Sequence, residues 1–296
     1  MTAIILDGLA MAKGIHIEIT QEVNLMKEKY GVVPGLAIVR VGDDSASKVY
    51  VRNKCLAAEK VGMSVYEYGL PLKTSHAEVK HMVNNLNARP DLHGIIIQLP
   101  LPKQIREDEL LESIDIHKDV DGLHPMNVGL LMSGKPNLIP ATPLAIQQLL
   151  LRSGHDPEGK HVVVCGRSKI VGKPITALLM QKLEGSNATV TVCHAKTENL
   201  ANITQQADIL IVAVGNPEVV TDDFVKPGAV VIDVGINRVE DAKRKRGYRL
   251  LGDVHYDKVS QKAGAITPVP GGVGPMTIAM LLKNTLQAAK YFISQR

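Results

Sequence analysis

The first candidate for chemistry is a lysine beside a tyrosine at helical spacing. Tyr50 and Lys54 are four residues apart, so a helix would place them on one face, which continues through small and apolar residues. A lysine in such a stripe can be partly desolvated in a cleft and exchange protons near neutral pH. The spacing alone favours the plainer interpretation, a surface lysine whose aliphatic stem lies along its neighbours.

Three polar side chains could join this lysine. Gln98 stands near the end of an apolar strand pattern, and ligands bind at the carboxyl edge of a parallel sheet, so its amide could orient a lysine or a heterocycle. Asp119 and Asp121 occupy a turn-like segment, where capping of the turn explains them equally well. Close approach of a ligand to the backbone, or alternatively a hinge or turn, would suit three glycines: Gly271, Gly272 and Gly274.

Phosphate binding is indicated by residues 162–172, which read VVVCGRSKIVG. A buried-strand pattern leads into a turn and then a helical run, as a dinucleotide site requires. Gly166 would supply the tight turn and Gly172 the close packing of helix on strand. Ser168 replaces the usual middle glycine, so the bare motif is weak and depends on its flanking strand and helix. A tight turn without a ligand is the alternative.

The choice of dinucleotide follows from the second strand of this series. NAD sites usually carry an acidic residue at the end of that strand, where it binds the ribose 2′-hydroxyl. Here the strand ends Cys193-His194-Ala195-Lys196-Thr197, without a carboxylate. Arg167, His194 and Lys196 could attract a 2′-phosphate, which favours NADP.

Composition excludes several other functions. The 296 residues include two Phe, seven Tyr and no Trp, too few for the aromatic platforms that bind single-stranded nucleic acid. The formal charge is only +4, and we interpret the basic run 243–246 as a solvated loop. The ten histidines show no metal spacing, so no metal is expected. Three cysteines without disulfide spacing, two of them expected to be buried thiols, and the absence of a signal peptide or membrane span favour the cytoplasm.

The elements that must position these residues form two series of alternating strands and helices. Apolar strands separated by helices predict parallel sheets covered on both faces. The first series predicts helices over 8–29, 45–61 (with Asp44 or Ser45 as N-cap) and 75–88, and strands over 36–41, 64–68 and 94–99. Five prolines within residues 100–142, together with Pro143, break regular structure, and a helix follows over 143–153. The second series predicts strands over 161–165, 188–193, 208–213, 229–233 and 249–252, and helices over 172–183, 198–206, 221–225 and 256–263. The Pro- and Gly-rich segment 267–275 fits neither element, and a last helix over 276–293 is expected to return to the first domain.

Seven motifs in order resemble the bifunctional methylenetetrahydrofolate dehydrogenase/cyclohydrolase family, across nearly the whole chain. They are Tyr50-Val-Arg-Asn-Lys54, Gln98-Leu-Pro-Leu-Pro102, Lys118-Asp-Val-Asp-Gly122, Gly166-Arg-Ser-Lys-Ile-Val-Gly172, Val231-Ile-Asp-Val-Gly-Ile-Asn-Arg238, Gly252-Asp-Val254 and Thr267-Pro-Val-Pro-Gly-Gly-Val-Gly-Pro-Met-Thr277.

The resemblance implies an α/β fold of two domains. Residues 1–140 would form a folate-binding catalytic domain with a parallel sheet, completed by 270–296. Residues 141–269 would form a Rossmann-like NADP-binding domain. The implied reactions are NADP-dependent oxidation of 5,10-methylenetetrahydrofolate and hydrolysis of the methenyl product to 10-formyltetrahydrofolate, in a homodimer whose cleft lies between the domains. Neither nucleic acid nor a membrane is an expected partner.

Residue roles are implied by position. Lys54 would be the catalytic lysine, assisted by Gln98, with Tyr50 packed on the folate and Asp121 bonded to the pterin. The folate pocket would also include Leu99, Pro100, Pro270, Gly271, Gly272, Val273 and Gly274. The dinucleotide would contact Gly166, Arg167, Ser168, Ile170, Val171, His194, Ala195, Gly215 and Ile236.

One departure and two alternatives accompany this resemblance. Some NADP-using relatives carry Ser where this chain has Ala195, so Arg167 would carry more of the 2′-phosphate contact. A dehydrogenase with little cyclohydrolase activity is the nearest alternative function. A non-catalytic folate- or nucleotide-binding regulator is a second, although such a protein would not need Lys54.

Overall fold

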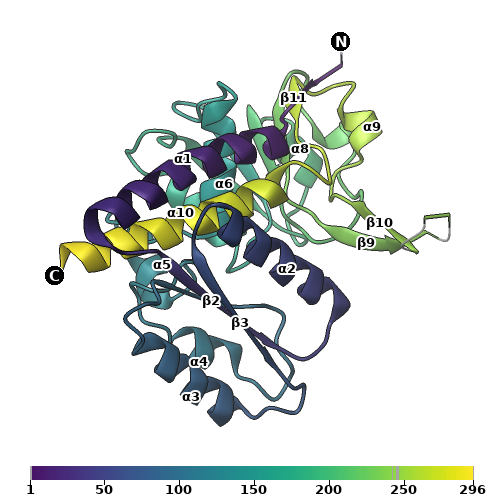
Figure 1. Ribbon diagram of the computed structural model, residues 1–296. Helices are drawn as coiled ribbons and strands as arrows, with labels where there is room; N and C mark the ends of the chain where they lie inside the picture. The colour runs from purple at the N-terminus through teal and green to yellow at the C-terminus, as the bar shows by residue number, and fades with distance from the viewer. Residues whose placement is uncertain (1, 242, 245–246, 296) are drawn as a thin grey trace. The chain divides into compact units, whose positions relative to one another are not determined.

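The computed structural model describes residues 2–241, 243–244 and 247–295. The chain divides into two compact units, and both are discontinuous in sequence (Figure 1). The dinucleotide unit, as we call it, comprises residues 1–12 and 142–277. The lysine unit comprises residues 13–141 and 278–296.

The lysine unit is built on a three-stranded parallel sheet in the order β3-β2-β4. Its strands are β2 (Gly35–Val41), β3 (Ser64–Leu70) and β4 (Gly94–Ile97). Its helices are α2 (Ser45–Lys60), α3 (His76–Asn87), α4 (Glu107–Leu111) and α5 (Pro125–Met132), joined by most of α1 (Gly8–Tyr30) and α10 (Val273–Ser294).

Side-chain alternation explains how this sheet is covered. Ala37 and Val39 of β2 point to one face, where they pack with apolar residues of α3 and α4 such as Val83 and Leu110. These two helices lie together beside the sheet in Figure 1. Helix α3 begins with a capping box in which Ser75 and Glu78 satisfy each other's backbone amides.

The dinucleotide unit contains a six-stranded parallel sheet in the order β1-β11-β8-β7-β5-β6. The strands are β1 (Ile4–Ile5), β5 (His161–Cys165), β6 (Thr189–Cys193), β7 (Ile209–Val212), β8 (Val230–Asp233) and β11 (Ala265–Ile266). A separate antiparallel hairpin pairs β9 (Asn237–Glu240) with β10 (Tyr248–Leu251). Because β6 and β7 flank β5 on opposite sides, the strand order reverses direction at β5. A crevice at the carboxyl end of β5 is therefore the expected ligand site.

Helices complete this unit. They are α6 (Ala141–Arg152), α7 (Gly172–Leu179), α8 (Leu200–Thr204), the 3-10 turn η1 (Asp222–Phe224) and α9 (Tyr256–Val259). One face of the sheet forms a buried core that includes Val163, Leu210 and Val231, and Leu200 and Phe224 pack against it. Cys165 and Cys193, register partners on β5 and β6, are buried free thiols, as predicted.

The predicted fold class is confirmed, including the two α/β units and the return of the last helix, whose residues 278–294 belong to the lysine unit. Two expectations are wrong. Residues 100–142 contain two short helices, and Pro125 occupies the first turn of α5, where its missing N–H costs nothing. Helix α10 begins at Val273, so Pro275 lies inside its first turn. The sequence patterns also missed β1, β9 and β11.

The predicted boundaries at residues 140 and 270 separate a folate-binding domain from an NADP-binding domain, and this division by ligand stays a prediction. Unlike those boundaries, the division by compactness assigns residues 1–12 and 270–277 to the dinucleotide unit. Within the part of the chain described, no helix is both long and apolar enough to cross a bilayer.

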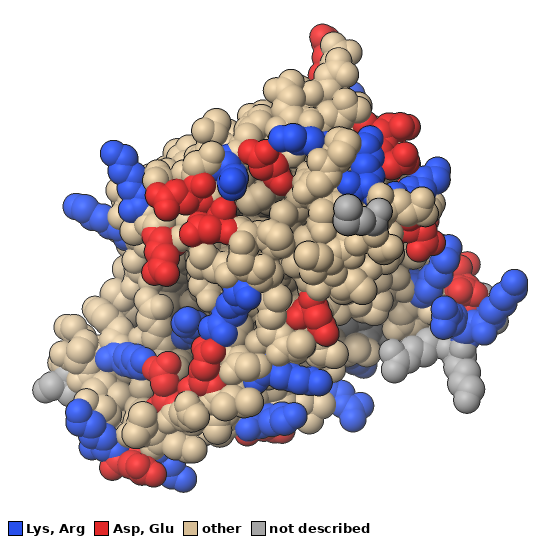
Figure 2. Space-filling model, turned by 90° about the horizontal axis from the view of Figure 1, so that it is seen from above, with Lys and Arg blue, Asp and Glu red and all other residues tan. Residues whose placement is uncertain are grey.

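Charges of both signs are interspersed on the face seen in Figure 2 rather than gathered by sign. Of the basic run 243–246, Lys243 and Arg244 are exposed in the turn joining β9 and β10. The other two residues of the run lie outside the described residues.

Candidate functional site

The lysine unit holds a buried ammonium group beside an amide. Lys54 lies on α2 and is only 5% exposed, unlike the surface lysine that spacing alone favoured. Its Nζ donates a hydrogen bond of 3.2 Å to Oε1 of Gln98, which follows β4. Nε2 of Gln98 donates to the carbonyl of Leu99 at 2.7 Å. Because that donor is committed, the amide presents its oxygen to Lys54.

Tyr50 and Asp121 belong to the same neighbourhood. The Tyr50 ring centroid lies 5.2 Å from Nζ of Lys54, so the two residues share the predicted face of α2. Burial, with a smaller contribution from the negative charge of Asp121, raises the pKa of Tyr50 to about 12. The phenol is therefore neutral at physiological pH and can donate a hydrogen bond.

The turn that carries Asp121 is held by Asp119, for which the sequence offered turn capping as one interpretation, and by two asparagines that the sequence reasoning did not assign. Asp119 is 1% exposed and accepts hydrogen bonds from the backbone of His124 (2.8 Å) and from Nδ2 of Asn127 (2.8 Å). Burial raises the pKa of the Asp119 carboxyl. Nδ2 of Asn284, on α10, donates to the carbonyl of Val120 at 2.9 Å. A lone Asn far along the chain carries no sequence signal for this contact.

Residues 270–274, predicted to line the folate pocket, fall in the dinucleotide unit with the predicted cofactor residues. Leu99–Pro100 and Val269–Pro270 are both cis peptides. A Cβ at Gly274 would lie 3.6 Å from Cδ1 of Ile236, whose side chain is 54% exposed. One predicted folate residue and one predicted cofactor residue are therefore neighbours within this unit.

The turn after β5 has the tight geometry that its glycines predict. Gly166 has a φ of +127°, and a Cβ there would lie 2.1 Å from the carbonyl oxygen of Ala213. A Cβ at Gly172 would lie 2.2 Å from the carbonyl oxygen of Gly166. Neither position accommodates a side chain, so the backbone can turn directly from β5 into α7.

Ser168 takes a structural role in this turn. Its hydroxyl accepts hydrogen bonds from the backbone N–H groups of Val171 (3.1 Å) and Gly172 (3.4 Å), at the start of α7. Among the described residues, the backbone N–H groups of Arg167 and Ile170 donate to no other group, and both residues are exposed. An anion would find free donors here beside a helix N-terminus.

The segment after β6 is a compact turn without an acidic side chain. The backbone N–H of His194 donates to Oγ1 of Thr197 at 3.0 Å, and that of Lys196 to Nδ1 of His194 at 3.2 Å. Ala195 and Lys196 are exposed. Gly215, in the loop after β7, is also exposed, with a φ of +69°. Among the described residues, no three or more His, Cys, Asp or Glu side chains form a group that could hold a metal.

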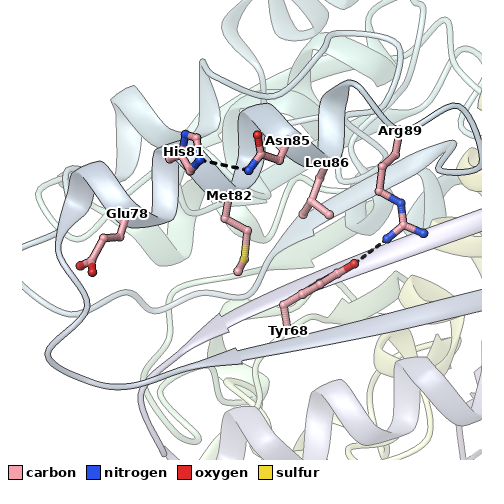
Figure 3. A pocket seen from close by; sticks show the side chains of 7 residues that line it. All are labelled: Tyr68, Glu78, His81, Met82, Asn85, Leu86 and Arg89. Atoms are coloured by element: carbon pink, nitrogen blue, oxygen red, sulfur yellow. Dashed lines mark hydrogen bonds between the residues drawn. The ribbon is translucent and has the colours of Figure 1, made fainter.

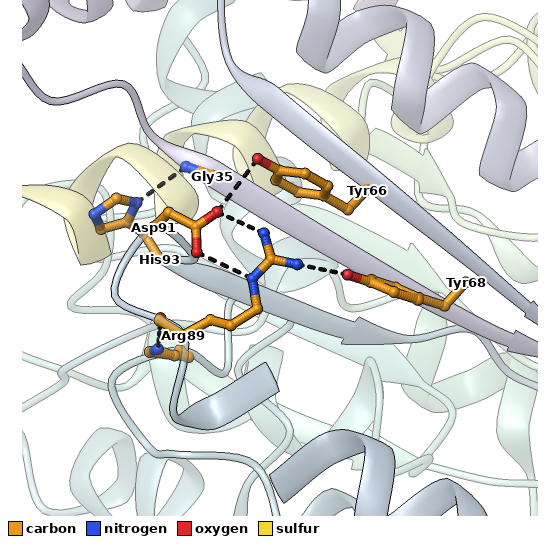
Figure 4. Close-up of polar contacts among 7 residues, drawn as sticks. Gly35, Tyr66, Tyr68, Arg89, Asp91 and His93 are labelled. Atoms are coloured by element: carbon orange, nitrogen blue, oxygen red, sulfur yellow. Dashed lines mark hydrogen bonds and ion pairs between the residues drawn. The ribbon is translucent and has the colours of Figure 1, made fainter. Parts of the chain in front are cut away.

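A surface pocket of about 340 Å³ lies elsewhere in the lysine unit, beside α3 and β3, and includes none of the predicted site residues (Figure 3). Its Arg89 guanidinium is already engaged. It donates to Tyr68 at 2.7 Å and to both oxygens of Asp91, and it lies 4.4 Å from the Tyr66 ring centroid (Figure 4). This cluster ties β3 to the segment before β4 and leaves the Arg89 guanidinium unavailable to a ligand.

Comparison with known proteins matches two family models to successive parts of the chain. The catalytic-domain model of tetrahydrofolate dehydrogenase/cyclohydrolase matches residues 6–121, and the NAD(P)-binding-domain model of that family matches residues 140–293. The bifunctional protein FolD of Chlorobium phaeobacteroides strain BS1 is 52% identical over 286 residues, or 96% of each chain.

Solved structures of FolD enzymes are similar to this chain over nearly its whole length. The bifunctional FolD enzyme of Campylobacter jejuni superposes with a TM-score of 0.91 at 44% identity, covering 97% of this chain and 98% of that one. The Trypanosoma brucei FolD enzyme, in complex with NADP and an inhibitor, gives a TM-score of 0.94 at 41% identity over 99% of both chains. On the evidence of both domain models and of relatives matched over nearly their whole length, this chain belongs to the tetrahydrofolate dehydrogenase/cyclohydrolase family.

Proposed function

We propose that this chain oxidises 5,10-methylenetetrahydrofolate to 5,10-methenyltetrahydrofolate with NADP, and hydrolyses that product to 10-formyltetrahydrofolate at Lys54. Family membership makes it a methylenetetrahydrofolate dehydrogenase and methenyltetrahydrofolate cyclohydrolase of one-carbon metabolism. The observation that carries the residue assignment is the buried Lys54 ammonium, bonded to an uncharged amide.

The chemistry of the hydrolysis explains this pairing. The methenyl group is cationic, and water that adds to its carbon must lose a proton before a C–N bond opens to give the formyl group. Lys54 would hold and move that proton. Gln98 carries no charge, so it positions Nζ without fixing it as a permanent ion pair. Its committed Nε2 keeps the amide in this orientation.

The other residues of this unit would bind the folate. The neutral phenol of Tyr50 offers a ring face and a donor, and the carboxylate of Asp121 can accept hydrogen bonds from a pterin. Leu99, Pro100 and residues 270–274 would complete the pocket. These roles are carried over from the family motifs.

NADP, when bound, supplies the hydride acceptor for the first step. The tight turn at Gly166 and the free N–H groups of Arg167 and Ile170 suit a pyrophosphate. The exposed Arg167 and the absence of a carboxylate in residues 194–197 suit a 2′-phosphate. The NADP complex of the Trypanosoma brucei relative supports this choice.

The test of the cofactor assignment is a comparison of both steps with NADP and NAD. Methenyl product is followed by absorbance, and kcat/KM should favour NADP. Arg167→Ala should raise the KM for NADP about tenfold while changing that for NAD little, because only NADP carries the 2′-phosphate. Arg249→Ala, which removes an equal charge from the exposed β10 position, is the control. Preference for NAD in the unaltered chain would contradict the assignment.

The same assay separates the alternatives. A dehydrogenase with little cyclohydrolase activity would accumulate the methenyl product, and a non-catalytic binding protein would form none. The homodimer and the cytoplasmic location remain predictions, and light scattering during size-exclusion chromatography would test the first.

A further inference from the structure

Two buried carboxylates lie together in the dinucleotide unit, outside the residues assigned so far. Asp233 is the last residue of β8, and Asp253 follows β10 by two residues. They are 4% and 0% exposed. Among the described residues, neither carboxylate has a Lys, Arg or His partner, so hydrogen bonds alone must offset the cost of burying them.

Asp253 binds a run of backbone amides. Its carboxylate accepts hydrogen bonds from three consecutive N–H groups, those of Val214 (2.7 Å), Gly215 (2.9 Å) and Asn216 (3.0 Å). It also accepts from Nδ2 of Asn237 at 2.8 Å. A single side chain thus fixes the loop after β7 and the start of the hairpin that follows Ile236.

Asp233 in turn holds Asp253 in place. Its carboxylate accepts from the backbone N–H groups of Gly235 (2.9 Å), Asp253 (2.9 Å) and Val254 (3.0 Å). Its own backbone N–H donates to Oγ1 of Thr267, after β11, at 2.8 Å. The pair therefore joins the segments that leave β7, β8, β10 and β11.

Two glycines make room for the pair. A Cβ at Gly252 would lie 1.8 Å from Oδ2 of Asp233, and one at Gly235 would lie 2.4 Å from Cγ of Asp253. Any larger residue at either position would displace a carboxylate. Glycine is therefore required at Gly235 and Gly252 because the two carboxylates occupy the space that a side chain would need.

The place of the pair in the sheet indicates which part of a dinucleotide it serves. A dinucleotide with its pyrophosphate at the Gly166 turn lies across the carboxyl ends of the strands. The turn at His194, after β6, suits the 2′-phosphate half. The other half, with the reacting ring, would then lie over β7 and β8, where Gly215 and Ile236 are exposed.

We propose that Asp233 and Asp253 are positioning residues for hydride transfer, which fix the loops of Gly215 and Ile236 around the nicotinamide half of the dinucleotide. This inference rests on the proposed use of a dinucleotide. The inference goes beyond the proposed function because it assigns a role to two carboxylates that would not touch the cofactor.

The test uses the two activities of the chain as signal and internal control. Asp253→Asn replaces an acceptor oxygen by an amide that faces N–H donors, so the loops should loosen. Dehydrogenase kcat/KM for NADP should fall at least tenfold. The kcat for hydrolysis of methenyltetrahydrofolate, measured without dinucleotide at saturating folate, should stay within about twofold, because the reacting Lys54 and its partner Gln98 belong to the other unit.

Asp208→Asn is the matched control. Asp208 stands before the amino end of β7, where it accepts from the backbone of His161 (3.0 Å) and from Lys226 (2.7 Å). The Asp208→Asn variant should keep both the dehydrogenase and the cyclohydrolase activity unchanged. If Asp253→Asn does not fold, Asn237→Ala, which cuts only the link to the hairpin, should show a smaller selective loss of dehydrogenase activity.

Equal loss of both activities in the variants, or unchanged dehydrogenase kinetics, would overturn the positioning role. Absence of NADP-dependent oxidation in the unaltered chain would instead refute the proposed function itself.

Discussion

The lysine cluster and the dinucleotide turn use opposite means to build a site. Around Lys54 the working groups are side chains, each fixed by another side chain or carbonyl. Around Gly166 the available groups are mainly backbone amides, and side chains are excluded by contact with neighbouring carbonyls. Replacing a functional atom should therefore affect chemistry in the first region, whereas adding an atom should affect shape in the second.

The largest expected effect comes from removing the lysine. Lys54→Met keeps most of the side-chain volume but removes the proton carrier, so cyclohydrolase activity should fall by about 10²–10⁴-fold. NADP affinity, measured by fluorescence titration, should not change. Lys48→Met is the control on the same helix, because Lys48 is exposed and, among the described residues, its ammonium pairs with Asp43 alone. Retained hydrolysis in Lys54→Met would refute the role given to this residue.

Adding one methyl group should be the most damaging change in the second region. Gly166→Ala places a Cβ against the Ala213 carbonyl at an unfavourable φ, and the free energy of unfolding should fall by about 3–5 kcal/mol. Gly228→Ala isolates the backbone term, because its φ is +81° but its Cβ would meet nothing within 4 Å. It should cost about 1 kcal/mol. Urea unfolding measures both variants. Equal decreases in the free energy of unfolding for Gly166→Ala and Gly228→Ala would contradict a steric cost at the Ala213 carbonyl.

A smaller effect concerns the pH dependence of stability. Burial, opposed by three backbone hydrogen bonds and reinforced by the nearby charge of Asp253, raises the pKa of Asp233 from 3.8 to about 6. Between about pH 4 and 6 the folded chain keeps a proton that the unfolded chain has lost. The contribution of Asp233 to the free energy of unfolding should therefore fall as pH rises through this window, by roughly 3 kcal/mol.

Urea unfolding of the unaltered chain and of Asp233→Asn at several pH values would measure this difference. The contribution of Asp208 to the free energy of unfolding should change with pH in the opposite direction. Its hydrogen bond with Lys226 lowers the pKa of its carboxyl, so its contribution should be lost as pH falls. Parallel pH profiles for Asp233→Asn and Asp208→Asn would contradict the burial of Asp233 as the dominant cause.

The two regions also differ in how far the sequence could predict them. Strands β5, β7 and β8 were predicted within a residue or so because their positions are buried and apolar apart from His161, the first residue of β5, and Asp233, the last residue of β8. Strand β9 was missed because three of the four residues in Asn237–Glu240 are polar, and the strand that pairs with it among the described residues is β10 of the same hairpin. Helix α5 was missed because Pro125 resembles a helix breaker when its first-turn position is unknown.

For the site, spacing placed Tyr50 and Lys54 on one helix face, but it could not predict burial of Lys54, which depends on packing distant in sequence. The place of Gln98 near the end of its strand already offered it as a partner for a lysine, and the family motifs identified that lysine as Lys54. Turn capping, one of the two interpretations offered for Asp119, agrees with its hydrogen bond from the His124 backbone. The contact of Asn284 and the pairing of Asp233 with Asp253 could not be predicted, because each joins segments distant in sequence that no local pattern encodes.

The discontinuity of both units bears on the order in which the chain emerges from the ribosome. Strand β1 pairs with β11 some 260 residues later, and Glu22 pairs with Lys290. Asn284, which ties α10 to the turn of Asp121, also belongs to the last stretch. Neither unit can therefore close its structure during synthesis until these last segments are available. A ribosome stalled near residue 270 would present two incomplete cores with exposed apolar surface. Chaperones that shield apolar surface should therefore bind the nascent chain until its last segments emerge.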